Sequence, residues 1–103
     1  MRESIYQAQL IRKLRRVFKG CFILKNDTDY MQGLPDLLIL YRDRWAMLEV
    51  KAHADADEQP NQAYYVDLFN RMSFAAFIYP ENEHEVLDAL ERSFKPNRAT
   101  RIS

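Results

Sequence analysis

The sequence predicts an α/β domain in which helices flank a central mixed sheet of about four strands. Two observations support this prediction. Stretches whose apolar residues recur at three- and four-residue steps occur near both ends of the chain and after its middle, and short apolar runs lie between them. The resulting order of elements is α-β-β-β-α-β-α. With 103 residues the chain has room for one hydrophobic core, so we expect a single domain over residues 1–95.

The first predicted helix covers residues 3–18. Its expected inward face consists of the apolar residues that share one side of a helix: Ile5, Ala8, Ile11, Leu14, Val17 and Phe18. Gly20 is a natural stop for this helix. The apolar run 21–26 predicts a first strand, and the turn-forming residues of 26–33 predict a loop.

Residues 35–41 and 45–51 predict two strands joined by a short turn around Asp43, which favours an antiparallel hairpin. Side chains alternate between the faces of a strand, so Glu49 and Lys51 should project from the same face. Residue 36 lies seven positions before residue 43, and residue 49 lies six positions after it. Asp36 and Glu49 are therefore expected side by side at the open end of the hairpin.

The second half of the chain continues with a polar segment at 52–58 and a helix over 60–72, with Pro60 in its first turn. The expected apolar stripe of this helix is Ala63, Val66 and Phe69, flanked by Tyr65, Leu68 and Met72. A last strand is predicted at 74–79 and a last helix at 82–93. The inward residues of the last helix should be Val86, Leu87, Leu90 and Phe94. Residues 96–103 are predicted to form a loose tail.

Composition excludes several classes of protein. The chain has 15 basic and 15 acidic residues, so it lacks the basic excess of a generic nucleic-acid binder. No window approaches the roughly 18 apolar residues of a membrane span, and the N-terminus has no apolar signal-peptide core. A single cysteine, Cys21, cannot form an intramolecular disulfide and is expected to be a small core residue. We therefore expect an intracellular protein.

Three charges on apolar strands, those of Asp36, Glu49 and Lys51, require a physical reason, because an ionised group is costly to desolvate unless it is paired or bound to a metal. One interpretation is a plain salt bridge on an exposed sheet edge. The other is a site for Mg²⁺, which takes oxygen ligands and would relieve the repulsion between the two carboxylates. The backbone carbonyl of Val50 could add a further oxygen.

Other polar residues allow both a functional and an ordinary interpretation. A cluster near the end of the first helix is either a solvated face or a phosphate-contacting, DNA-binding face: Arg12, Arg15, Arg16 and Lys19. His53 is either a substrate contact or an ordinary loop histidine. The tyrosines could stack on bases or lie at the edge of the core: Tyr30, Tyr41, Tyr64 and Tyr65. Cys21, His53 and His84 do not have zinc-site spacing.

The segment Gly33-Leu34-Pro35-Asp36, followed by Glu49-Val50-Lys51 with Glu49 thirteen positions after Asp36, resembles the signature of the PD-(D/E)XK nuclease superfamily. More narrowly, the chain resembles the small stand-alone virus-type replication-repair nuclease (VRR-NUC) domains of phages and bacteria. The matching positions are Glu3, Gly33, Lys51, Pro60 and Gln62. The resemblance extends from residue 3 to about residue 90.

This resemblance implies a restriction-endonuclease-like core and Mg²⁺- or Mn²⁺-dependent hydrolysis of phosphodiester bonds. Asp36 and Glu49 would bind the metal together with the Val50 carbonyl, and Glu3 would reach it through water. Lys51 would orient or activate the attacking water, and Gln62 would hold that water or a neighbouring phosphate.

It also implies a DNA endonuclease similar to Holliday junction resolvases, acting as a homodimer on branched DNA in the cytoplasm of a bacterial or phage-infected cell. Two alternatives remain open at this point. One is a non-catalytic nucleic-acid-binding or assembly module on the same fold. The other is a sequence-specific restriction-type enzyme, for which the small size leaves little room for a recognition domain.

Overall fold

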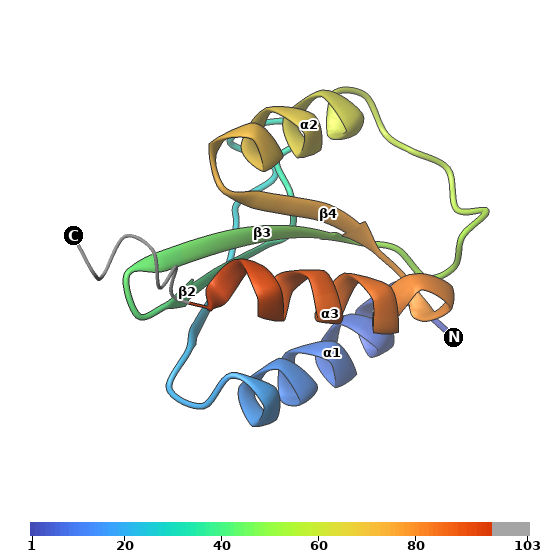
Figure 1. The fold of residues 1–103 in the computed structure, drawn as a ribbon. Helices are drawn as coiled ribbons and strands as arrows, with labels where there is room; N and C mark the ends of the chain where they lie inside the picture. Colours follow the sequence, from blue (N-terminus) through green and yellow to red (C-terminus); the bar gives the residue numbers. More distant parts are fainter. Residues whose placement is uncertain (96–103) are drawn as a thin grey trace.

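A four-stranded mixed sheet lies between α2 on one face and α1 with α3 on the other (Figure 1). The computed structural model describes residues 1–95. Its elements are α1 (Glu3–Val17), β1 (Phe22–Lys25), β2 (Leu37–Tyr41), β3 (Arg44–Val50), α2 (Gln62–Met72), β4 (Phe74–Ile78), the short 3₁₀ helix η1 (Pro80–Asn82) and α3 (Glu83–Phe94). The predicted α/β class, order of elements and mixed sheet are confirmed. The predicted tail at 96–103 lies outside the described residues.

The strands follow one another across the sheet in the order β1-β2-β3-β4. The first three strands pair antiparallel, whereas β4 returns parallel to β3 after the crossover through α2. Tyr41 pairs with Arg44, so the β2–β3 turn consists of Arg42 and Asp43, with Arg42 at a φ of 60°. The predicted antiparallel hairpin is confirmed, and it is shorter at its open end because β2 begins at Leu37.

The main core lies between the sheet and the two helices α1 and α3. The buried side chains of α1 are Tyr6, Leu10 and Leu14, followed by Phe18 just after the helix. The predicted stripe was therefore wrong in part, because Ile5, Ala8 and Val17 are exposed. The buried residues recur at four-residue steps, whereas the predicted stripe used three- and four-residue steps. The two stripes lie close together on the helix surface, and the position of the neighbouring α3 determines which of them is buried. On α3, Leu87, Leu90 and Phe94 are buried as predicted, and Val86 is half-buried.

Helix α2 packs against β3 and β4 on the opposite face. It begins at Gln62 and not at residue 60, because Asn61 has a φ of 70° and cannot continue a right-handed helix. Ala63 and Met72, predicted as part of its apolar stripe, are exposed. The helix covers only half of its sheet face, so a narrower stripe of half-buried residues is sufficient.

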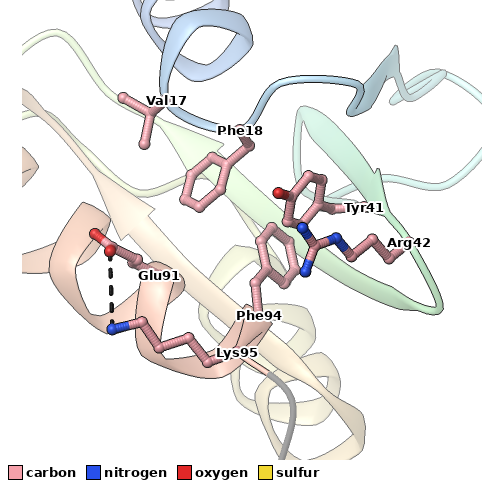
Figure 2. Close-up of a pocket in the computed structure, with 7 residues that line it drawn as sticks. All are labelled: Val17, Phe18, Tyr41, Arg42, Glu91, Phe94 and Lys95. Carbon is pink, nitrogen blue, oxygen red and sulfur yellow. Dashed lines mark ion pairs between the residues drawn. The ribbon is translucent and has the colours of Figure 1, made fainter.

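An aromatic cluster closes the end of the domain that carries the β2–β3 turn. Figure 2 shows the rings of Phe18, Tyr41 and Phe94 packed together, with centroids 5.2–5.6 Å apart. The Arg42 guanidinium lies 4.9 Å from the Tyr41 ring centroid, a cation–π contact. These residues line a cavity of about 230 Å³ together with the Glu91–Lys95 ion pair. Cys21 is half-buried against the same core, in agreement with its prediction.

Within residues 1–95, no helix is both long and apolar enough to cross a membrane.

Candidate functional site

The hairpin register brings Asp36 and Glu49 together. Leu37 pairs with Leu48, so the next position outward along the two strands places Asp36 opposite Glu49. Asp36 lies just before β2, and its side chain bonds to the neighbouring strand β3. Its Oδ2 accepts a hydrogen bond of 2.9 Å from the backbone amide of Val50. The Asp36 carbonyl also accepts a hydrogen bond of 2.8 Å from the Asn26 amide. The predicted pairing is therefore confirmed, and Asp36 is held by segments on both sides.

Glu49 and Lys51 are buried although both are ionisable. Glu49 is 2% exposed and Lys51 is 6% exposed. Residues 46, 48 and 50 of β3 face the main core, so Glu49 projects toward the face that α2 covers. The parallel β3–β4 ladder extends past the strand end, where the Lys51 amide donates to the Ile78 carbonyl at 2.9 Å. The side chains of these two candidate site residues are thus positioned by one regular strand and its extension.

Gln62, the first residue of α2, connects these two side chains. Its Nε2 donates to Glu49 Oε2 at 2.9 Å, and its Oε1 accepts from Lys51 Nζ at 2.7 Å. The same Oε1 accepts from the Gln59 amide at 2.8 Å. Lys51 Nζ makes a further hydrogen bond of 3.0 Å to the Asp57 carbonyl. Gln62 thus contacts the carboxylate and the lysine directly, whereas the sequence predicted contacts to water or phosphate.

The salt-bridge interpretation does not fit this arrangement. Strand β3 is an inner strand of the sheet and not an exposed edge. Within residues 1–95, Asp36, Glu49 and Lys51 form no ion pair. The Lys51 ammonium instead donates to the Gln62 side-chain oxygen and the Asp57 carbonyl. Neither Asp36 nor Glu49 therefore has a positively charged side chain as an ion-pair partner within residues 1–95.

These residues open into a polar cavity of about 330 Å³. Glu3, at the first turn of α1, forms part of its wall, so the structure brings all five predicted site side chains to one cavity. Sequence reasoning missed the loop residues that also line it, which are Thr28, Gln32, Leu34, Asp57 and Gln59. Their only signal was their position in the two loops that flank the strand ends at Asp36 and Lys51.

Burial and neighbouring negative charge raise the pKa values of two carboxyl groups in the cavity, those of Glu49 and Glu3. Burial, the negative charge of Asp36 and the close approach of the Asp36 carboxylate raise the pKa of Glu49 to about 9, and the positive charge of Lys51 only partly opposes this rise. Partial burial and the negative charge of Asp36 also raise the pKa of Glu3 above its ordinary value, and the positive charge of Lys51 partly opposes this rise. Near neutral pH the site therefore favours a proton or another cation between its carboxylates.

One buried oxygen atom of the site is available to contact a cation. Among the buried side-chain nitrogen and oxygen atoms of residues 1–95, only Glu49 Oε1 lacks a hydrogen-bond partner. An unsatisfied buried acceptor costs about 1–3 kcal/mol. In the described part of the chain, no three His, Cys, Asp or Glu side chains are placed to hold a metal ion by themselves. A Mg²⁺ ion would suit this limited set, because it is commonly held by one or two carboxylates and keeps several waters.

The other candidate residues lie away from the cavity or point to solvent. The basic cluster of α1 is exposed, and Arg12 and Arg16 follow Glu3 by nine and thirteen residues. At about 1.5 Å per residue they lie about 14 and about 20 Å further along the helix. The remaining members of the cluster, Arg15 and Lys19, are also exposed.

The histidine and tyrosine candidates separate into two groups. His53, Tyr30 and Tyr64 are exposed. Tyr41 and Tyr65 pack against other aromatic rings, which agrees with the interpretation of those two as core-edge residues.

No family model, curated protein or solved structure matches this chain.

Proposed function

We propose that this protein is a metal-dependent DNA endonuclease with a restriction-endonuclease-like, PD-(D/E)XK core. The observation that carries the proposal is the unsatisfied, buried Glu49 Oε1 beside Asp36, with Lys51 held next to it by Gln62. A buried carboxyl group with a strongly raised pKa, beside a second, half-buried carboxylate in a polar cavity, is typical of a functional site and is costly as a purely structural element.

Asp36, Glu49 and the Val50 carbonyl would hold Mg²⁺ or Mn²⁺, and Glu3 would reach it through water from the cavity wall. When bound, such an ion lowers the pKa of a coordinated water and stabilises negative charge on phosphoryl oxygens. Lys51 would supply a compact positive charge beside the scissile phosphate and orient the attacking water. Gln62 would keep the Lys51 ammonium and the Glu49 carboxylate in a fixed relative position.

The charges around the cavity favour an approach of DNA along α1. The loop between β3 and α2 carries Asp55, Asp57 and Glu58, which would repel the phosphate backbone. The basic residues of α1 from Arg12 to Arg16, in contrast, lie about 14–20 Å from the cavity along the helix. Duplex DNA carries one negative charge per about 1.7 Å of axis, so a bound duplex would reach this cluster with phosphates several base pairs from the cut.

A homodimer on branched DNA completes the proposal. Phe22, Leu24 and Leu40 form an exposed apolar patch, the sheet-face patch, on the half of the sheet that α2 leaves uncovered. Within residues 1–95, strand β1 is also an edge strand, with no strand paired to its outer side. Two copies joined here would bury apolar surface and place two sites under two-fold symmetry, which suits a four-way junction.

A charged residue in the sheet-face patch should therefore abolish dimerisation. We expect wild-type protein to sediment as a dimer at micromolar concentration and Phe22→Lys to sediment as a monomer. Met72→Lys is the matched control, because Met72 is 64% exposed and Phe22 is 70% exposed, but Met72 lies at the end of α2 and outside the patch. A monomeric wild type, or a Phe22→Lys variant that remains dimeric, would contradict this surface.

The activity is tested with purified protein and linear, nicked and four-way DNA, with Mg²⁺, with Mn²⁺ or with chelator. We expect cleavage that requires the metal and is fastest on the four-way substrate. Calorimetric titration with Mn²⁺ is the companion measurement. Absence of both cleavage and Mn²⁺ binding would favour the alternative function, a non-catalytic nucleic-acid-binding module.

A further inference from the structure

Gly33, in the loop before β2, touches the segment that precedes α2. A Cβ atom built on Gly33 would lie 2.7 Å from Asn61 Cβ, 2.7 Å from the Pro60 carbonyl oxygen and 2.8 Å from the Asn61 carbonyl carbon. Such distances are too short for real carbon contacts, and two of the three atoms belong to the backbone. Only glycine allows these two segments to approach so closely.

The contact lies directly beside the start of α2. Asn61 adopts a φ of 70°, and Gln62 follows as the first residue of the helix. A second link joins the same segments, since Asn61 Nδ2 donates to the Gln32 carbonyl at 3.5 Å. Residues 59–62 form the turn that leads into α2, in which the Gln62 backbone amide donates a hydrogen bond to the Gln59 carbonyl at 3.3 Å. A displacement of Pro60 and Asn61 would therefore carry Gln62 with them.

Gln62 is the side chain through which such a displacement would reach the site. Its hydrogen bonds to Glu49 and Lys51 measure 2.9 and 2.7 Å, and both lie inside the protein. Hydrogen bonds weaken steeply when donor and acceptor separate or lose alignment. A shift of about 1 Å at the start of α2 would lengthen or break both of them.

We propose that Gly33 is a positioning residue for the candidate site, acting through Asn61 on Gln62. The absent side chain sets the distance between the loop that leads to Asp36 and the start of α2. It thereby aligns Gln62 with Glu49 and Lys51. The consequence for DNA cleavage rests on the proposed function, whereas the alignment of Gln62 does not.

The chain contains its own matched control for this proposal. Gly20 and Gly33 have φ values of +89° and +91°, so alanine at either position meets a comparable left-handed backbone strain. Within residues 1–95, a Cβ at Gly20 would have no neighbour within 4 Å. Any difference between Gly33→Ala and Gly20→Ala beyond that shared strain therefore reports the contact with Pro60 and Asn61.

The readout is the pair of side-chain amide signals of Gln62 in ¹⁵N-correlated NMR spectra, assigned by their loss in Gln62→Ala. We expect Gly33→Ala to shift these signals and to increase their exchange with solvent, and Gly20→Ala to leave them unchanged. Mn²⁺ affinity should fall about 10- to 100-fold in Gly33→Ala alone, as for other residues that orient metal ligands.

Equal Gln62 signals in both alanine variants would overturn the proposal. If Gly33→Ala does not fold, the same comparison is made with Asn61→Gly added to both variants, which removes one of the three close atoms and the strain at Asn61. The same rule then decides, with a shift supporting the proposal and unchanged signals overturning it. The NMR readout needs neither metal nor DNA, so failure of the endonuclease assay and failure of this proposal are distinguishable.

Discussion

Replacing Asp36 by asparagine should lower the rate of metal-dependent DNA cleavage about 10²- to 10³-fold while leaving the fold intact. Asparagine keeps the shape of the side chain, and its oxygen can still accept the 2.9 Å hydrogen bond from the Val50 amide. It loses the negative charge that would hold a divalent cation. The expected defect is therefore in catalysis and Mn²⁺ affinity and not in stability. Single-turnover cleavage, Mn²⁺ calorimetry and thermal unfolding measure the three quantities.

Asp43→Asn is the matched control, because Asp43 lies in the turn at the other end of the same hairpin and is exposed. It should cleave DNA at the wild-type rate. Lys51→Ala should lose activity to a similar extent as Asp36→Asn, since the ammonium group that Gln62 holds in the cavity is removed. Undiminished cleavage by either Asp36→Asn or Lys51→Ala would falsify the assignment of this cavity as the catalytic site.

The metal-free protein should lose stability as the pH rises from about 4.5 to about 9, because of Glu49. In the unfolded chain this carboxyl has an ordinary pKa near 4.5, whereas burial and the charge of Asp36 raise the pKa of Glu49 to about 9 in the fold. Below pH 4.5 both states are protonated and the stabilisation is complete. Above it the unfolded state releases the proton and the folded state retains it, so unfolding is favoured by about 1.4 kcal/mol per pH unit until Glu49 ionises in the fold.

Glu49→Gln should remove this dependence. Between pH 4.5 and 7.5, the difference in unfolding free energy between the variant and the wild type should change by on the order of 4 kcal/mol in favour of the variant. The measurement is chemical or thermal unfolding in chelator between pH 4.5 and 9. Glu85→Gln serves as the control, because Glu85 is exposed on α3. A constant difference between wild type and Glu49→Gln across this range would show that Glu49 does not titrate in this way.

Mn²⁺ should reverse the order of stability. At pH 7.5 it should raise the unfolding temperature of the wild type, because an ion bound only to the folded state stabilises it, and it should have little effect on Glu49→Gln. Residues of functional sites often lower the stability of the free protein, and binding of the ligand then restores it.

The sequence by itself determined the class of the fold and the central pair of the site. Apolar periodicity indicated the helices and strands in their correct order. The hairpin placed Asp36 beside Glu49, because two residues in the turn fix the register of every pair along two antiparallel strands. Strand alternation likewise placed Glu49 on the side opposite the core residues Leu48 and Val50. Each of these predictions depends on residues that are close in the chain and on the fixed geometry of the backbone.

Only the tertiary structure decided which side of α1 is buried, that Gln62 connects Glu49 with Lys51, and that Gly33 touches Asn61. These features depend on distances between segments that are far apart in the sequence. The pattern of a single helix allows several rotations about its axis, and the sequence of a loop does not state which other loop it meets. The packing of α2 and α3 on opposite faces of the sheet determines both the rotation of the helices and which loops meet, because each helix buries its apolar side against the strands.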